Sequence, residues 1–145
     1  MLAVNKFPQT YIDGCRSKVD AQISAYKDVV TAAKDLDRSG GTRLDPEIEA
    51  FEPVFFNNMV LLLDYYFVHR TRTLEKKDGN PLNEVRVLCD SMLTNVGIMA
   101  ADKTIRLDPA KSLLGYQVGD KIKLNEGDFL LLSKAFFAEI ENKYT

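Results

Sequence analysis

The stretch PVFFNNMVLLLDYYFVHRTRTLEKK, residues 53–77, decides the fold of this chain. Asn57, Asn58 and Asp64 alone interrupt its apolar run from Val54 to Val68. A helix that is apolar on nearly every side is either central in its domain or in contact with another subunit. We therefore expect a central helix here, and its excess apolar surface supports the hypothesis of a homodimer.

Amphipathic helices are predicted on both sides of this stretch. Apolar residues recur at spacings of three and four from residue 11 to 36, and the pattern repeats from Leu82 to Met99. Helix starts are marked by an aspartate or asparagine followed by proline at Asp45 and Asn80, and by Asn125 before the last helix. The predicted helices span residues 11–36, 45–77, 81–99 and 126–144, with a kink or break at Pro53.

The connection between the third and fourth predicted helices has a different pattern. Residues 103–107 and 121–124 alternate polar and apolar side chains with a period of two, which is typical of strands. We expect the two segments to pair. The predicted fold is mainly α: an antiparallel four-helix bundle with a short two-stranded β ribbon between its third and fourth helices, in one domain over residues 1–145.

Composition narrows the classes of function. The net charge of -2 gives no general attraction to phosphate backbones, so we expect no nucleic-acid partner. The N-terminus resembles no signal peptide, and the longest apolar run is too short to span a membrane. Cys15 and Cys89 have no metal-binding spacing and are expected to be free thiols packed as small hydrophobic residues. These features predict a cytoplasmic protein that does not bind a membrane.

Four segments of the chain resemble a known family. They are FFNNMV (55–60), YFVHR (66–70), DGNPLNEVR (78–86) and AFFAEIE (135–141). Together they resemble a family of small uncharacterised actinobacterial helical proteins, and the similarity extends over most of the chain. The resemblance implies a bacterial cytoplasmic protein and supplies no activity, cofactor or catalytic residue.

Polar residues at the end of the central helix form the first candidate site. If the second and third helices make an antiparallel hairpin, Arg72 faces Glu84, and His69 lies near Arg86 and Asp90. A carboxylate beside the histidine favours its charged form and tunes it for proton transfer, while the arginines suit an anionic ligand. The structural alternative is an Arg72–Glu84 ion pair with a hydrogen-bonded histidine, and we favour it.

The polar residues inside the apolar run form a second candidate group. Buried amides such as Asn57 and Asn58 require partners, so they either line a pocket or hold loop backbone and helix register. Asp64 either takes part in a site or accepts hydrogen bonds from neighbouring tyrosines. We favour the structural role for the two asparagines and leave the role of Asp64 open.

The sequence also limits the chemistry available. A single histidine excludes the paired Glu-x-x-His motifs of di-iron bundles, so no metal and no cofactor are expected. We expect a non-enzymatic protein that self-associates as a homo-oligomer or binds a protein partner. The alternative is a binder of a small anionic ligand, or a cofactor-free enzyme, with a pocket between the second and third helices that uses His69, Arg72 and Arg86.

Overall fold

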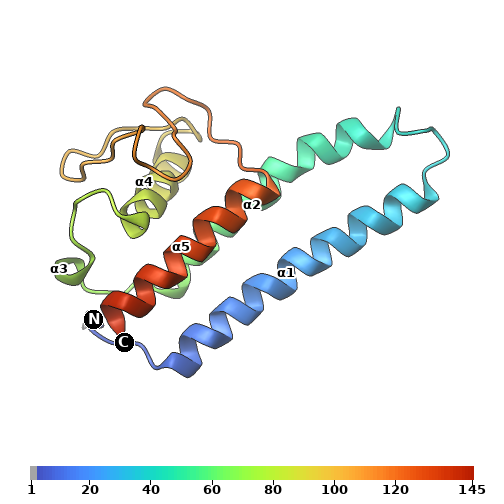
Figure 1. Cartoon of the computed structure of the whole chain (residues 1–145). Helices are drawn as coiled ribbons and strands as arrows, with labels where there is room; N and C mark the ends of the chain where they lie inside the picture. The colour runs from blue at the N-terminus through green and yellow to red at the C-terminus, as the bar shows by residue number, and fades with distance from the viewer. Residues whose placement is uncertain (1–2) are drawn as a thin grey trace.

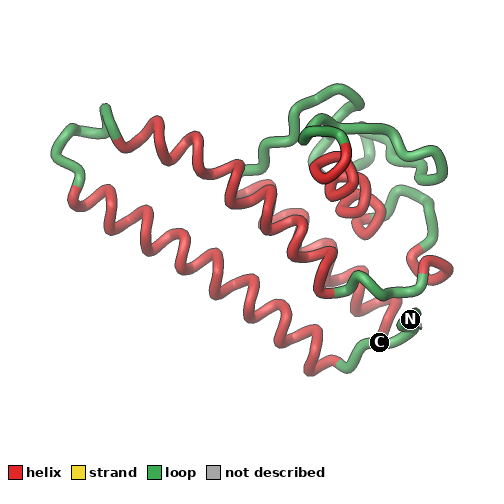
Figure 2. The backbone as a smooth tube through the Cα atoms, turned by 180° about the vertical axis from the view of Figure 1, so that it is seen from behind, coloured by secondary structure: helices red, strands yellow, loops and turns green. Residues whose placement is uncertain are grey.

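Helices make up the regular structure of the chain. The computed structural model describes residues 3–145, and this part contains five helices and no strand (Figures 1 and 2). They are α1 (Gln9–Leu36), α2 (Leu44–Tyr66), α3 (Arg72–Glu75), α4 (Pro81–Thr94) and α5 (Glu126–Tyr144). The prediction of a mainly helical protein is confirmed.

Helix α2 is the central element, as its apolar sequence predicts. It packs against α1, α4 and α5, and its buried side chains are Phe56, Met59, Val60 and Leu63. Pro53 lies within α2 without ending it, so the chain has no break at this point. Burial of four large apolar residues is worth about 1.5–3 kcal/mol each, which explains why tertiary packing overrides the local cost of proline.

The far ends of α1 and α2 form a two-helix arm, residues 27–55. Figure 1 shows this hairpin projecting beyond α4 and α5. The last buried residue of α1 is Tyr26, the first of α2 is Phe56, and none between them is buried. The rings of Tyr26 and Phe55 stack at the base of the arm, with centroids 4.7 Å apart. The arm therefore carries apolar residues without a core of its own.

The predicted helix over residues 45–77 ends earlier than expected, at Tyr66. Beyond it the N-terminal segment pairs with the chain: Val4 donates a backbone hydrogen bond to His69 and accepts one from Thr71, at 2.7 and 2.9 Å. These are backbone groups that a continuing helix would need for itself. A pairing between residues more than 60 positions apart thus ends the helix, and no local sequence signal predicts it.

The helix starts that the sequence predicts are present at α4 and α5. The side chain of Asn80 accepts from the backbone of Leu82 and Asn83, and Asn125 forms a capping box with Asp128. Helix α4 ends at Thr94, five residues before the predicted end at Met99. Residue 96 has a positive φ of 57°, which is incompatible with a continuing helix.

The predicted β ribbon is wrong. The described chain contains only isolated bridges, Val4 with Arg70 and Ile98 with Lys121. The second ribbon segment pairs instead with the turn after α4 and with a side chain. The N–H of Ile122 donates to the carbonyl of Gly97 at 2.9 Å, while Asn57 donates to the carbonyl of Ile122 at 2.9 Å and accepts from the backbone N–H of Leu124 at 3.1 Å. The amide of one asparagine in α2 therefore makes bonds that a neighbouring strand would otherwise supply.

Candidate functional site

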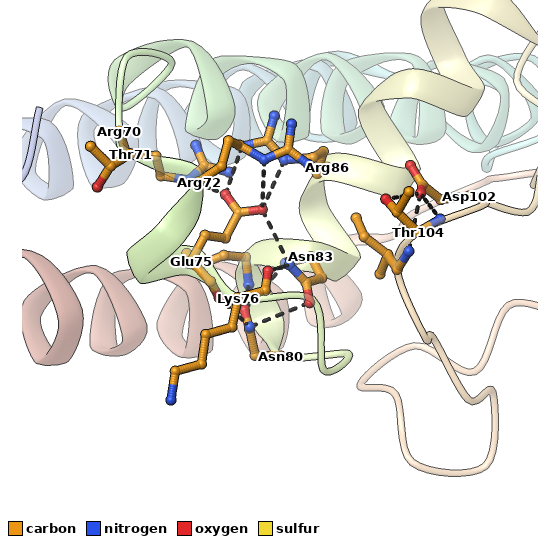
Figure 3. Close-up of polar contacts among 12 residues, drawn as sticks. Arg70, Thr71, Arg72, Glu75, Lys76, Asn80, Asn83, Arg86, Asp102 and Thr104 are labelled. Atoms are coloured by element: carbon orange, nitrogen blue, oxygen red, sulfur yellow. Dashed lines mark hydrogen bonds and ion pairs between the residues drawn. The ribbon is translucent and has the colours of Figure 1, made fainter. Parts of the chain in front are cut away.

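Glu75, the last residue of α3, is the centre of the most polar buried cluster. Its side chain is fully buried and accepts hydrogen bonds from two arginines (Figure 3). Arg86 binds both carboxylate oxygens, at 2.8 and 2.6 Å, and Arg70 binds one at 2.7 Å. The amide of Asn83 adds a third donor at 3.2 Å. The arrangement satisfies a buried carboxylate with charged donors from two segments of the chain, the segment after α2 and helix α4.

The electrostatics follow from this geometry. Burial acts to raise the pKa of Glu75, but hydrogen bonds and positive charge from Arg86 and Arg70 outweigh it. The pKa therefore lies below its usual range, and Glu75 is ionised at neutral pH. The same contact raises the pKa of the Arg86 guanidinium. The cluster behaves as a fixed ionic junction between α3, α4 and the end of α2.

Three buried polar atoms near this junction have no hydrogen-bond partner: Oδ1 of Asp64, Nη2 of Arg70 and Oγ1 of Thr71. The Asp64 oxygen lies 3.0 Å from Nη1 of Arg70, where it makes an ion pair without the angle of a hydrogen bond. Unpartnered buried groups cost about 1–3 kcal/mol each. The junction thus contains buried polar atoms to which it gives no hydrogen-bond partner.

The predicted pairing of Arg72 with Glu84 is wrong. Glu84 is buried and accepts from the backbone N–H groups of Leu113 and Leu114, at 2.8 and 3.0 Å. Burial raises the pKa of Glu84 in spite of these two donors. Arg72 is half exposed and lies 3.9 Å from Glu75. Glu84 therefore anchors the long loop between α4 and α5. The predicted pairing is wrong because α2 ends at Tyr66, which changes the residues that face each other.

His69 lies apart from the buried cluster. Its side chain is exposed, and its backbone carbonyl pairs with Val4. Asp90 is also exposed, although partial burial of its carboxyl raises its pKa. The positive charge of Arg86 opposes this shift, and the negative charge of Asp64 adds to it. The structure thus brings Arg72 and Arg86 to Glu75 and places Asp64 and Asp90 in the field of Arg86, whereas His69 and Glu84 lie outside this group.

The two asparagines of α2 have different roles. Asn57 binds the backbone of the loop before α5, as its favoured structural interpretation predicts. Asn58 is exposed and donates to the carbonyl of Val54 in its own helix, at 2.7 Å. It therefore lies on the outer face of α2, where its amide retains hydrogen-bonding capacity.

A groove of about 470 Å³ lies between α2 and α4. Its lining is mostly apolar and consists of Asn58, Leu61, Leu62, Asp64, Tyr65, Val68, Cys89 and Leu93. Cys89 is a free, buried thiol at this groove, and Cys15 is likewise free and buried, as predicted. Two of the predicted site residues line the groove, whereas His69, Arg72, Arg86 and Asp90 are not part of its lining. The groove is thus open, and Asp64 is the only charged residue among the described residues of its lining. Arg70 and Arg86 bind Glu75 instead.

The groove belongs to a longer surface that we call the α2 stripe. On α2 its residues recur at alternating spacings of three and four and are exposed or half-buried: Phe51, Val54, Asn58, Leu61 and Tyr65, with exposed Val68 just beyond the end of the helix at Tyr66. Tyr65 is the most exposed of the large apolar side chains in this stripe, at 71%. Such a repeat is the a/d pattern of helices that pair in coiled coils. The spacing is visible in the sequence, but only the structure shows that these residues face outwards.

Among residues 3–145, no three His, Cys, Asp or Glu side chains gather as a metal site would require. No described helix has both the length and the apolar character needed to cross a membrane.

Comparison with known proteins gives no match: no family model, no curated protein and no solved structure is significantly similar to the chain.

Proposed function

We propose that the protein is a binding module whose α2 stripe pairs with a helix of another protein chain. The observation that carries this proposal is the exposed or half-buried a/d repeat of Phe51, Val54, Asn58, Leu61 and Tyr65 on the central helix. Monomeric proteins rarely leave a contiguous apolar surface of this kind open to water. A helix laid into a groove would bury it, and such binding uses anchors at these spacings.

The surrounding structure supports this function. In our proposal the four longer helices form a four-helix bundle that holds α2 rigid, with Glu75 and its arginines fixing one end. Leu93 of α4, which is 69% exposed, extends the apolar surface on the far side of the groove. A rigid helical platform loses little conformational entropy on binding. The two buried, unpaired cysteines fit a reducing cytoplasm, and we propose a bacterial cytoplasmic protein.

The test is photo-crosslinking in the cells that produce the protein. A photoreactive phenylalanine analogue replaces Tyr65 in the α2 stripe, and the matched control carries it at Leu131, which is 50% exposed on α5. We expect a discrete protein adduct from position 65 and none from position 131. Equal labelling from both positions, or no adduct from position 65, would contradict the proposal.

A further inference from the structure

We infer that the partner of the α2 stripe is a second copy of this chain, packed with its α2 antiparallel to the first. This inference rests on the proposed function, because it names the occupant of the same surface. It is carried by two independent properties of α2: the distribution of charge along it and the order of large and small residues in the stripe.

The charge along α2 is strongly asymmetric. Its first half carries Asp45, Glu47, Glu49 and Glu52, and no lysine or arginine occurs between Leu44 and His69. Just beyond the other end are exposed Arg72, Lys76 and Lys77. Parallel pairing would place acidic residues beside acidic residues. Antiparallel pairing places the acidic start of each helix near the basic segment of its partner, which favours association and fixes orientation.

The order of residues in the stripe is self-complementary. In an antiparallel pair an a position faces a d position of the partner, so Tyr65 faces Val54 and Asn58 faces Leu61, while Phe51 lies opposite the segment that follows the end of the partner's α2 at Tyr66. Every layer then combines a larger with a smaller side chain, which fills the interface evenly. Parallel pairing would stack phenylalanine on phenylalanine and valine on valine, giving layers of unequal width.

Asn58 lies beside the two-fold axis of this arrangement. At a rise of 1.5 Å per residue, the two copies of Asn58 are only ~5 Å apart along the axis. Its side chain makes one bond, to Val54, so its oxygen and second N–H are open to the partner's Asn58. A single asparagine in an apolar a/d stripe specifies register at a cost in stability. The structure thus supplies a reason for a polar residue at the centre of an apolar surface.

The experiment uses the purified full-length chain and two measurements. Sedimentation equilibrium at high micromolar concentration should give twice the 16.4 kDa chain mass. Tyr65→Glu should reduce the mass to that of one chain, whereas Leu131→Glu on α5 should leave it unchanged. A single-chain mass for the wild type would overturn the inference, and so would Leu131→Glu acting like Tyr65→Glu. Circular dichroism melts confirm that each variant is folded.

Disulfide trapping then determines the orientation. Val54→Cys and Tyr65→Cys variants are oxidised alone and as a mixture, with the wild type reporting any background from the buried native cysteines. Antiparallel pairing predicts a dimer only in the mixture, because the two copies of residue 54 lie ~16 Å apart along the axis, beyond disulfide reach. A disulfide dimer of Val54→Cys alone would overturn the antiparallel arrangement.

Charge exchange gives an independent check of the same geometry. Glu47→Arg and Arg72→Glu should each weaken the dimer several-fold, and the double variant should recover most of the affinity, since antiparallel pairing brings each new arginine near the partner's segment that carries the new glutamate. Additive loss in the double variant would overturn the charge argument. An adduct with a different protein at position 65, combined with a monomeric purified chain, would refute the second copy and leave the proposed function standing.

Discussion

The surroundings of Glu75 and the outer face of α2 differ from the usual distribution of residues, in opposite ways. Charged residues are usually exposed and large apolar residues are usually buried. Around Glu75, charged groups are buried and hold one another; along α2, Phe51, Val54 and Tyr65 are apolar and exposed. A buried polar group or an exposed apolar patch is more informative than a residue in its usual place. The difference teaches that the buried polar residues serve the fold here, whereas the exposed apolar ones are the surface to which we assign the proposed binding function.

Removing the charge of Glu75 should produce the largest loss of stability. In Glu75→Gln, Arg70 and Arg86 keep their positive charges without a carboxylate between them. Breaking a buried ion pair from one side costs about 3–5 kcal/mol. Urea denaturation measures the free energy of unfolding, and Asp20→Asn on the exposed face of α1 is the matched control. A loss below 1 kcal/mol, as in many surface pairs, would show that the junction is not structural.

Gly79 offers the next largest effect, because it connects the Glu75 junction to the long loop. Its φ is +88°, and a Cβ there would lie 2.4 Å from the carbonyl oxygen of Arg106. Gly97 is the matched control, with a φ of +74° and nothing within 4 Å of its Cβ position. Both alanine variants suffer about 1–2 kcal/mol of backbone strain, and Gly79→Ala adds about 1–3 kcal/mol of steric overlap. Equal melting curves for the two would contradict this close approach.

Asn57 and Asn58, two adjacent residues of α2, show the same contrast between a side chain that serves the fold and one on the surface. Asn57→Ala leaves the carbonyl of Ile122 and the buried N–H of Leu124 without partners, so about 1–3 kcal/mol should be lost. Asn58→Ala removes a bond within the helix only, and its effect on the monomer should stay within about 0.5 kcal/mol. Hydrogen exchange at Leu124 should accelerate in the first variant alone. Unchanged exchange in Asn57→Ala would mean that the loop does not depend on Asn57.

The pH dependence of stability should separate the two buried carboxylates. The folded pKa of Glu75 is lowered, so its contribution is present above the unfolded value of about 4.3 and is lost as the pH falls through the folded pKa. The folded pKa of Glu84 is raised, so its ionised form opposes folding and protonation relieves this. Relative to wild type, Glu75→Gln should therefore lose its disadvantage in acid, and Glu84→Gln should show the opposite trend.

Local signals in the sequence were sufficient for much of the fold and for little of the site. The stripe of α1, the caps at Asn80 and Asn125, and the central position of α2 depend on neighbouring residues and were predicted. The end of α2 at Tyr66 depends on Val4, and the role of Glu75 depends on that end, because it turns Arg70 inwards. Long-range pairings of this kind leave no periodic pattern, so Arg70 and Glu75 were missed.

The prediction of a β ribbon was wrong for a related reason. Period-two alternation at residues 121–124 correctly indicates extended backbone with Ile122 and Leu124 buried. It does not identify the partners of that backbone, which here are an asparagine side chain on a helix and the carbonyl of Gly97. Alternation therefore predicts which side chains point inwards more reliably than it predicts a sheet.

Tyr65→Ala should have the smallest effect on the fold and a decisive one on association. The side chain is 71% exposed, so its removal should change the unfolding free energy of the monomer by no more than about 0.5 kcal/mol. In a paired state it is a central aromatic anchor, and the loss of such an anchor costs about 2 kcal/mol or more of binding energy. Denaturation at dilute, monomeric concentration and sedimentation at high concentration measure the two quantities separately. If the monomer were strongly destabilised, Tyr65 would belong to the fold, and the contrast between the buried charges and the exposed stripe would fail at this residue.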